Sequence, residues 1–320
     1  MQHVTSSDQL ESGRGPLVSW GCLGGGHSPV GLVGSIGLGG IGLGAALRGG
    51  LSVVAGAMAG GVVLVQGASR GLGLHFCKHI LSARKEARVI ATCRSPEAAN
   101  ALQALHRLYP QTLTVLRLDA TRDAEIREAA EVVAKEHGRL DLLINSGAML
   151  HPSARGETSL QEVSAEGLSI TLATNTIGPL VMAKYFAPLL RKGTGAFGHQ
   201  FADQAKRHRA ILVNLTAKVG SIGDNALGGW YSYRMSKAAL NMATKNLSIE
   251  LGRGKTKVVC VSLHPGTVNT NLSKPYHRNV PKDKLFTPEY SVNCLMNIIE
   301  NLDMGKTGKF FAWDGSALPW

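Results

Sequence analysis

The feature that most constrains the fold is an apolar run followed by a glycine-rich turn. Residues 62–65 read Val-Val-Leu-Val, which is typical of a strand buried on both faces of a parallel sheet. A GxxxGxG turn follows, and then a helical stretch from Leu74 to about Ala83. Glycines let such a turn approach a pyrophosphate closely, and the helix N-terminus offers unpaired N–H groups to the negative charge. The predicted dinucleotide contacts in this turn are Gly67, Ser69, Arg70, Gly71, Leu72 and Gly73.

The end of the next strand indicates which dinucleotide binds. This strand is predicted over Ala87–Cys93, and Arg94 follows it at the place where the adenosine ribose would lie. An acidic residue there would bind a free 2′-hydroxyl, whereas an arginine suits a 2′-phosphate. Arg70, inside the glycine-rich turn, can approach the same phosphate. The two cations predict NADP(H) as the cofactor.

Strands and helices then alternate along the chain. Strands are predicted over residues 113–118, 140–145, 211–215, 257–263 and 309–312, and helices over residues 123–137, 166–190, 232–251 and 288–301. Regular alternation of this kind predicts an α/β fold, a single Rossmann-type doubly wound domain with a mostly parallel sheet of about seven strands. The active site of such a fold lies at the carboxyl ends of the strands.

The first sixty-one residues read as a separate leader, before a domain that covers residues 62–320. They are rich in glycine, and residues 30–47 are uncharged but contain seven glycines. A low-complexity leader, an organelle transit peptide and a weak membrane anchor all remain open. Gly37, Gly39 and Gly42 match GxGxxG, but more glycine follows them, so we reject a cofactor site there. The predicted location is cytoplasmic, or organellar (chloroplast or mitochondrion) if the leader is a transit peptide.

Charge and cysteine content limit the other classes of function. The formal net charge is +12, yet the basic residues are scattered, so a phosphorylated cofactor accounts for part of the excess and no nucleic acid is expected as a partner. The five cysteines include no CxxC pair, which argues against a disulfide framework or a zinc site. We expect no metal, and no membrane segment in the core domain.

The predicted reactive group is a tyrosine four residues before a lysine. Tyr233 and Lys237 would share one face of a helix. Free tyrosine has a pKa of about 10 and is a poor acid–base group at neutral pH. A neighbouring ammonium favours the phenolate, so we expect Lys237 to lower the pKa of Tyr233. The YxxxK spacing is common by itself, but it gains weight on a helix that follows the fifth strand.

The order of these motifs resembles the short-chain dehydrogenase/reductase family from about Val62 to Trp320. The resemblance implies that Tyr233 donates a proton to a substrate carbonyl and that Lys237 also holds the nicotinamide ribose. It implies a homo-oligomer and a small-molecule carbonyl substrate. It assigns Asn175 to a proton-relay water, and Asp119 with the adjoining Ala120 to the adenine side. The Pro265-Gly266-Thr267-Val268-Asn269-Thr270 segment is similar to the family's PGxVxT, which implies cofactor contacts from Pro265, Gly266, Val268 and Thr270.

Two further segments point to one branch of the family. Residues 219–225 and 229–233 resemble the C-factor and Sniffer-type carbonyl reductases, as does the ending from Gly308 to Trp320. The loops 150–157 and 276–286 are expected to build the substrate pocket. Residues 192–209 read as a long insertion before the fifth strand, either a partner-binding loop or, as we favour, a tolerated excursion.

Two positions depart from the family pattern. After the fourth strand the chain reads Asn145-Ser146-Gly147 where the family has Asn-Ala-Gly, and we expect all three residues still to contact the cofactor. Ala217 stands where the family has a serine that binds the substrate carbonyl. Losing such a donor typically costs about 3–4 kcal/mol, or 100- to 1000-fold in rate. Thr216 and Ser221 are the candidate replacements.

These observations predict an NADPH-dependent oxidoreductase that reduces a carbonyl to an alcohol. The alternative, motivated by Ala217, is a non-catalytic NADP(H)-binding regulatory or signalling protein. A nucleic-acid-binding protein is a third hypothesis, and it rests on charge alone.

Overall fold

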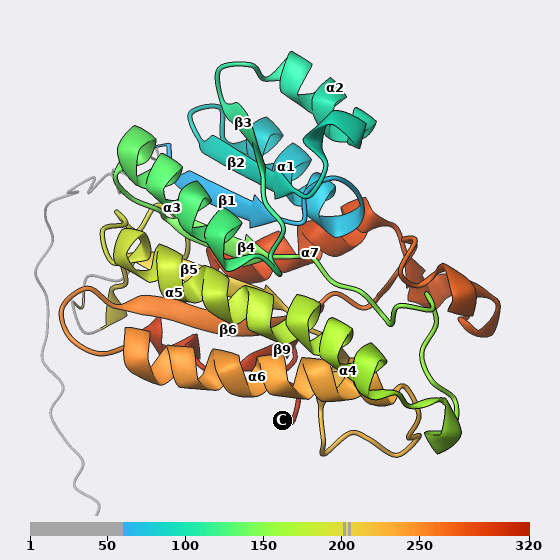
Figure 1. The fold of residues 1–320 in the computed structure, drawn as a ribbon. Helices are drawn as coiled ribbons and strands as arrows, with labels where there is room; N and C mark the ends of the chain where they lie inside the picture. The colour runs from blue at the N-terminus through green and yellow to red at the C-terminus, as the bar shows by residue number, and fades with distance from the viewer. Residues whose placement is uncertain (1–59, 201–202, 204–205) are drawn as a thin grey trace, which may run out of the picture. The chain divides into compact units, whose positions relative to one another are not determined.

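The computed structural model describes residues 60–200, 203 and 206–320, and Figure 1 shows their fold. The predicted leader and its glycine decoy, except for Gly60 and Gly61, lie outside the described residues.

The centre of the domain is a seven-stranded sheet in which neighbouring strands are all parallel, in the order β3-β2-β1-β4-β5-β6-β9. Its strands are β1 (Val62–Gln66), β2 (Arg88–Cys93), β3 (Leu113–Arg117), β4 (Leu142–Asn145), β5 (Ala210–Leu215), β6 (Val258–His264) and β9 (Phe310–Ala312). The chain runs outward from β1 to β3 and then crosses back to β4, so the strand order reverses between β1 and β4. Ligands of doubly wound sheets bind outside the carboxyl ends at this reversal. The predicted fold class is confirmed.

Helices cover both faces of this sheet, as Figure 1 shows. One layer comprises α1 (Gly71–Ala83), α2 (Asn100–Leu108) and α7 (Pro288–Glu300), and the other comprises α3 (Asp123–His137), α4 (Ala165–Leu172), α5 (Gly178–Leu190) and α6 (Tyr231–Leu251). Because side chains alternate along a strand, Val63 and Val65 of β1 enter the first core and Val62 and Leu64 enter the second. Both layers therefore pack on apolar runs of the kind read from the sequence.

The helix predicted over residues 166–190 is interrupted, contrary to expectation. A π-helical turn (Ala173–Ile177) separates α4 from α5, and the Gly178 N–H reaches back to the Ala173 carbonyl. Pro179 explains part of the interruption, because proline lacks the N–H that would bond to residue 175. A π turn of this kind often marks a functional site.

Three further elements were not predicted. They are α2 and two short strands, β7 (Thr267–Val268) and β8 (Leu285–Phe286), which pair with each other in parallel. Together β7 and β8 bring the PGxVxT segment beside the loop that precedes α7.

Part of the predicted insertion belongs to the core rather than to a tolerated excursion. Phe197 is fully buried, and the Arg84 guanidinium lies 4.2 Å from its ring centre. Thr194 donates its backbone N–H to the Asp141 carboxylate at 2.6 Å. Residues 193–197 are thus anchored at the amino ends of the central strands.

Among the described residues, no helix is long and apolar enough to cross a membrane. Within the same residues, no three His, Cys, Asp or Glu side chains are grouped as metal ligands would be.

Candidate active site

The glycine-rich turn is closely packed between β1, β2 and β4. Gly67 has φ +81°, and its N–H and that of Ala68 donate to the Thr92 carbonyl at 3.0 and 2.9 Å. A Cβ atom on Gly67 would lie 2.5 Å from Gly147 Cα, and one on Gly73 would lie 2.2 Å from the Gly67 carbonyl oxygen. Any side chain at either position would therefore push apart the elements that form the turn. The glycine spacing thus allows the backbone to fold tightly here, and its approach to a pyrophosphate stays a prediction.

Gln66 joins the two loops of the cofactor side, and sequence reasoning missed it. Its side-chain oxygen accepts the Gly147 N–H at 2.9 Å, and its carbonyl accepts the Ser146 N–H at 3.0 Å. Ser146 and Gly147 are therefore held against the end of β1, and their contact with the cofactor stays a prediction. The sequence does contain a signal that could have identified Gln66, because it is a polar residue at the end of an otherwise apolar strand.

Asn145 points away from the loop that it begins. Its side-chain nitrogen donates to Asn214 Oδ1 at 2.8 Å, and Asn214 in turn donates to Thr244 Oγ1 at 2.8 Å. Asn145 and Asn214 are almost fully buried between the sheet and α6. The Asn145 side chain thus supports the base of the loop, and its contact with the cofactor stays a prediction.

The residues predicted for the adenosine side lie at the carboxyl ends of β1, β2 and β3. Arg70 is the residue before α1, Arg94 directly follows β2, and both side chains are exposed. Asp119 accepts bonds from the N–H and the hydroxyl of Thr121 at 2.9 and 2.8 Å. Ala120 is buried under α5, where a Cβ on Gly178 would lie 2.7 Å from its carbonyl oxygen.

The PGxVxT segment closes onto the glycine-rich turn. Thr270 Cγ2 lies 3.5 Å from the position of a Cβ on Gly71. Gly266 has φ +78°, and a Cβ there would lie 2.6 Å from the Phe286 ring. Pro265 accepts the Ser291 hydroxyl at 2.7 Å, and Val268 is buried in β7. This segment and the turn together border the space where the sequence predicts the cofactor.

Tyr233 and Lys237 lie one helical turn apart near the start of α6, and both are buried. Lys237 Nζ donates to the Leu215 carbonyl at 2.8 Å and lies 5.8 Å from the centre of the Tyr233 ring. Burial lowers the pKa of Lys237 to about 7. Burial also raises the pKa of Tyr233 above its ordinary value.

The expected lowering of the tyrosine pKa by the lysine is therefore wrong for this structure. Loss of water disfavours the charged form of both groups and sets the direction of both shifts. A phenol with a raised pKa stays protonated at neutral pH, but it is a weaker acid than free tyrosine.

Asn175 lies in the π-helical turn and is fully buried. Its side-chain nitrogen donates to the Met149 carbonyl at 2.7 Å and to Ser236 Oγ at 3.0 Å, while its oxygen accepts the Met149 N–H at 2.9 Å. Asn175, which belongs to the predicted site, thus links the loop after β4 to α6, the helix that carries Tyr233.

Neither candidate replacement for the missing serine forms a hydrogen bond with Tyr233 in the described part of the chain. The Thr216 hydroxyl turns toward α6 and donates to the Lys237 carbonyl at 3.4 Å. The Ser221 hydroxyl donates to the Trp320 carbonyl at 3.3 Å and accepts the Asp224 N–H at 3.1 Å. Ala217, with an extended backbone, occupies the serine position between them. The predicted catalytic roles of Thr216 and Ser221 therefore gain no support.

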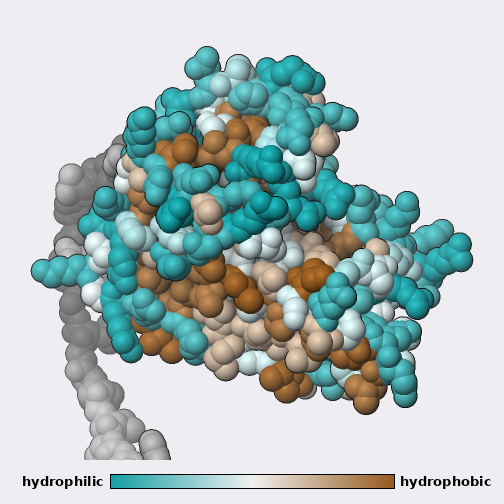
Figure 2. Space-filling view, in the orientation of Figure 1, coloured by the Kyte–Doolittle hydropathy of each residue, from teal (hydrophilic) through white to brown (hydrophobic). Residues whose placement is uncertain are grey.

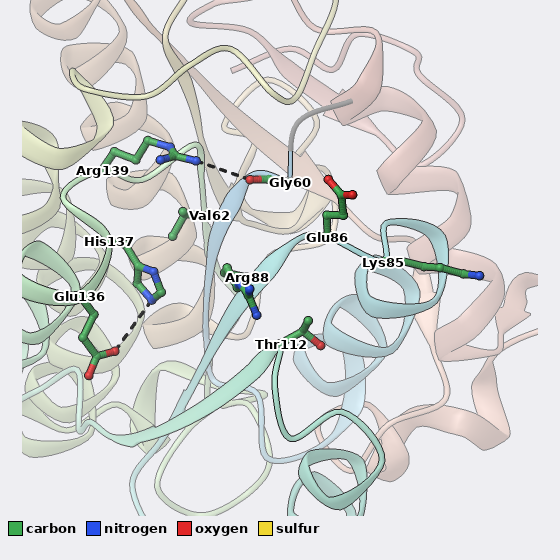
Figure 3. Close-up of a pocket in the computed structure, with 9 residues that line it drawn as sticks. All are labelled: Gly60, Val62, Lys85, Glu86, Arg88, Thr112, Glu136, His137 and Arg139. Carbon is green, nitrogen blue, oxygen red and sulfur yellow. Dashed lines mark hydrogen bonds and ion pairs between the residues drawn. The ribbon is translucent and has the colours of Figure 1, made fainter. Parts of the chain in front are cut away.

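A separate hollow of about 550 Å³ lies at the opposite, amino edge of the sheet (Figure 3). Figure 3 shows its mixture of charged side chains, with Arg139 directed at the Gly60 carbonyl, 3.5 Å away. It is lined by Gly60, Val62, Lys85, Glu86, Arg88, Thr112, Glu136, His137 and Arg139. The strands separate this hollow from Tyr233, so the predicted chemistry does not use it.

Comparison with known proteins agrees with this geometry. Residues 61–281 match the family model described as short chain dehydrogenase. An uncharacterized oxidoreductase of Schizosaccharomyces pombe is 32% identical over 81% of this chain and 97% of its own length. C-signal of Myxococcus xanthus is 32% identical over 57% of this chain and 94% of its own length.

Solved structures give the same relationship. The NADPH-bound carbonyl reductase from chicken fatty liver is 32% identical with a TM-score of 0.71, covering 82% of this chain and all of that one. Carbonyl reductase Sniffer of Drosophila melanogaster is 29% identical with a TM-score of 0.70, again covering 82% of this chain and all of that one. The chain therefore belongs to the short-chain dehydrogenase family of oxidoreductases, among relatives that include C-signal and Sniffer.

Proposed function

We propose that the protein is an NADPH-dependent carbonyl reductase. The observation that carries the proposal is the buried pair of Tyr233 and Lys237 on α6, linked through Ser236 to Asn175 in the π-helical turn. When bound, NADPH would supply a hydride to the substrate carbonyl carbon. The product would be the corresponding alcohol.

The described residues fit that cofactor. Gly67, Gly73 and Gly147 pack so closely that no Cβ fits among them, which leaves the backbone of the turn bare, and the following α1 N-terminus suits a pyrophosphate. Arg70 and Arg94 lie at neighbouring strand ends and would hold the 2′-phosphate. The NADPH found in the chicken carbonyl reductase, a 32% identical neighbour, supports this choice.

In this proposal Tyr233 is the proton donor. Burial keeps its phenol protonated at neutral pH, so the O–H is available as the carbonyl oxygen gains negative charge. Lys237, held by the Leu215 carbonyl, would bond to the nicotinamide ribose and orient it. Asn175 would hold the water through which Tyr233 regains its proton.

Ala217 favours a second candidate, a protein that binds NADP(H) and regulates without turnover. The hydroxyls of Thr216 and Ser221 are both engaged elsewhere, so the oxyanion lacks a donor that the family pattern supplies. A missing donor costs about 100- to 1000-fold in rate. Such a site would be slow or silent, while its cofactor-binding half stays intact.

The test is NADPH oxidation by the full chain with a panel of reactive aldehydes and diketones. Turnover that disappears in Tyr233→Phe is expected from the reductase. Ala217→Ser should then raise kcat, by up to about 100-fold if the new hydroxyl reaches the oxyanion. Tight NADPH binding with no turnover in either the wild type or Ala217→Ser would instead support the regulatory candidate.

A further inference from the structure

The catalytic helix α6 begins from a strained turn. Gly228, Gly229 and Trp230 have φ values of +66°, +64° and +49°, so three successive residues are left-handed before the helix turns right-handed at Tyr231. Glycine adopts this conformation freely, but a bulky side chain does so only at a cost in free energy. Residues in such conformations persist where the surroundings fix them, and they gather at functional sites. Trp230 stands three residues before Tyr233.

Glu157 fixes this turn from the loop after β4. Its backbone carbonyl accepts the Trp230 N–H at 2.6 Å, and its carboxylate accepts the Ser232 N–H at 3.1 Å. The Ser232 hydroxyl donates to the same carboxylate oxygen. The residue before α6 gives no side-chain cap, so Glu157 supplies the cap from elsewhere in the chain. An anion at a helix N-terminus is also favoured by the helix dipole.

The burial of this carboxylate is unusual for a cap. The Glu157 side chain is 1% exposed, and its second oxygen, Oε2, has no hydrogen-bond partner among the described residues. His151 Nε2 lies 3.9 Å from the other oxygen, and Nδ1 of the same ring accepts the Ser153 N–H at 3.2 Å. A buried, partly satisfied carboxylate destabilises a fold compared with an apolar residue. A helix cap alone does not require a carboxylate that is buried and only partly hydrogen-bonded.

The same loop also reaches the substrate side. The Gly156 N–H donates to the Tyr276 hydroxyl at 2.8 Å, and the Tyr276 ring lies 4.4 Å from the Trp230 ring. The Trp230 ring in turn lies 6.3 Å from the Tyr233 ring in an edge arrangement. The loops 150–157 and 274–279 therefore meet at Trp230, beside the proposed proton donor.

We propose that Glu157 is a positioning residue for Tyr233. By holding both the strained turn and the first turn of α6, it sets the direction of the phenol, and through Gly156 and Tyr276 it couples that direction to the two pocket loops. This inference rests on the proposed reductase function, in which Tyr233 donates the proton. A misplacement of a reacting group by about 1 Å can cost about 100-fold in rate.

The test compares Glu157→Gln with a matched control on the same loop. Glu162→Gln removes a carboxylate that also accepts a backbone N–H, from Thr158 at 2.6 Å, but this side chain is exposed and its carboxylate lies 3.6 Å from the Arg155 guanidinium. We expect Glu157→Gln to lower kcat by about 10- to 100-fold, with NADPH affinity within about twofold of wild type. Glu162→Gln should match wild type in both. An unchanged kcat in Glu157→Gln, or equal losses in the two variants, would overturn the proposal.

A second variant, Ser232→Ala, keeps the proposal testable if Glu157→Gln does not fold. Ser232→Ala removes one bond to Glu157 and keeps the backbone N–H, so it should lower kcat in the same direction by a smaller factor. If Glu157→Gln does not fold, a wild-type kcat in Ser232→Ala overturns the proposal.

A third measurement separates this inference from the proposed function. If the wild type reduces no carbonyl, the reductase proposal fails, and positioning is read instead from 3-fluorotyrosine-labelled protein with NADPH bound. The ¹⁹F resonance that Tyr233→Phe removes should shift or split in Glu157→Gln and stay in place in Glu162→Gln. A resonance that is unchanged in Glu157→Gln refutes the positioning role on its own.

Discussion

Replacing the buried lysine of the site should stabilise the protein while it abolishes turnover. Lys237 is 2% exposed and its pKa falls from 10.5 to about 7. Between these two pH values the unfolded chain binds a proton that the folded chain does not, so stability rises with pH. At pH 7 the burial of Lys237 therefore costs about 4 kcal/mol, and at pH 9 about 2 kcal/mol. Lys237→Met keeps the apolar stem and removes the titrating group.

Part of that gain is offset by the lost bond from the Lys237 amine to the Leu215 carbonyl, which contributes about 0.5–1.5 kcal/mol because the folded chain holds much of the amine uncharged. The expected net stabilisation of cofactor-free protein is therefore about 3 kcal/mol at pH 7. The sharper expectation is that the difference between variant and wild type shrinks by about 2 kcal/mol from pH 7 to pH 9. Urea unfolding of both proteins at pH 7 and pH 9 measures this change. The other titrating groups contribute equally to variant and wild type, so they cancel when the two free energies of unfolding are subtracted. A difference that is equal at the two pH values would show that Lys237 is not desolvated as described.

Three other predictions concern the cofactor loops and the surface of α6. Arg94→Asp should weaken NADPH binding by about 10- to 100-fold and spare NADH, because it removes a charged bond to the 2′-phosphate; equal losses for both cofactors in a binding titration would contradict this. Gly67→Ala should abolish NADPH binding. The control is Gly315→Ala, which adds similar backbone strain at φ +83° but has no atom within 4 Å of the new Cβ, so it should leave binding intact. Met235, Met242 and Ile249 repeat every seven residues as an exposed apolar stripe on α6, in the region where Figure 2 shows apolar side chains gathered. Met242→Glu should therefore dissociate a homo-oligomer, as measured by sedimentation velocity. A wild type that is already monomeric would refute this prediction.

The parts of the fold that could be predicted from sequence depend on local pattern. Residues 62–73 combine a buried strand, glycines at fixed spacing and a helix start, and each of these signals is read within a few residues. Helix α3 was predicted over Asp123–His137 and has those bounds, since its apolar residues repeat along one face and Gly138 ends it in a left-handed conformation. By contrast, α2 was not predicted although Leu102, Leu105 and Leu108 recur at helical spacing, because it spans only nine residues, Asn100–Leu108.

The parts that could not be predicted depend on contacts between distant segments. The π-helical turn is fixed by bonds between Asn175 and Met149, and Gln66 acts through Gly147, about eighty residues away. The spacing of Tyr233 and Lys237 placed both on one helix face but carried no information on burial, and burial decides the direction of both pKa shifts. Sequence patterns thus predicted which groups meet, while their electrostatics follow from the packing around them.

The groups that destabilise the fold lie together at the start of α6, and their position helps to choose between the reductase and the regulatory candidate. A buried lysine, a left-handed tryptophan and a partly satisfied carboxylate, Glu157, all lie at or against the first two turns of α6. The glycine-rich turn at Gly67 and Gly147 needs neither Trp230 nor Glu157, because it is built from β1, β4 and α1. A protein that only bound NADP(H) would keep Lys237 for the nicotinamide ribose, but it would be more stable with an apolar residue in place of Glu157. Trp230 and Glu157 lie beside Tyr233 rather than at the pyrophosphate site, so they favour the proposal that Tyr233 reacts. The reductase proposal then predicts that Ala217 slows turnover without abolishing it.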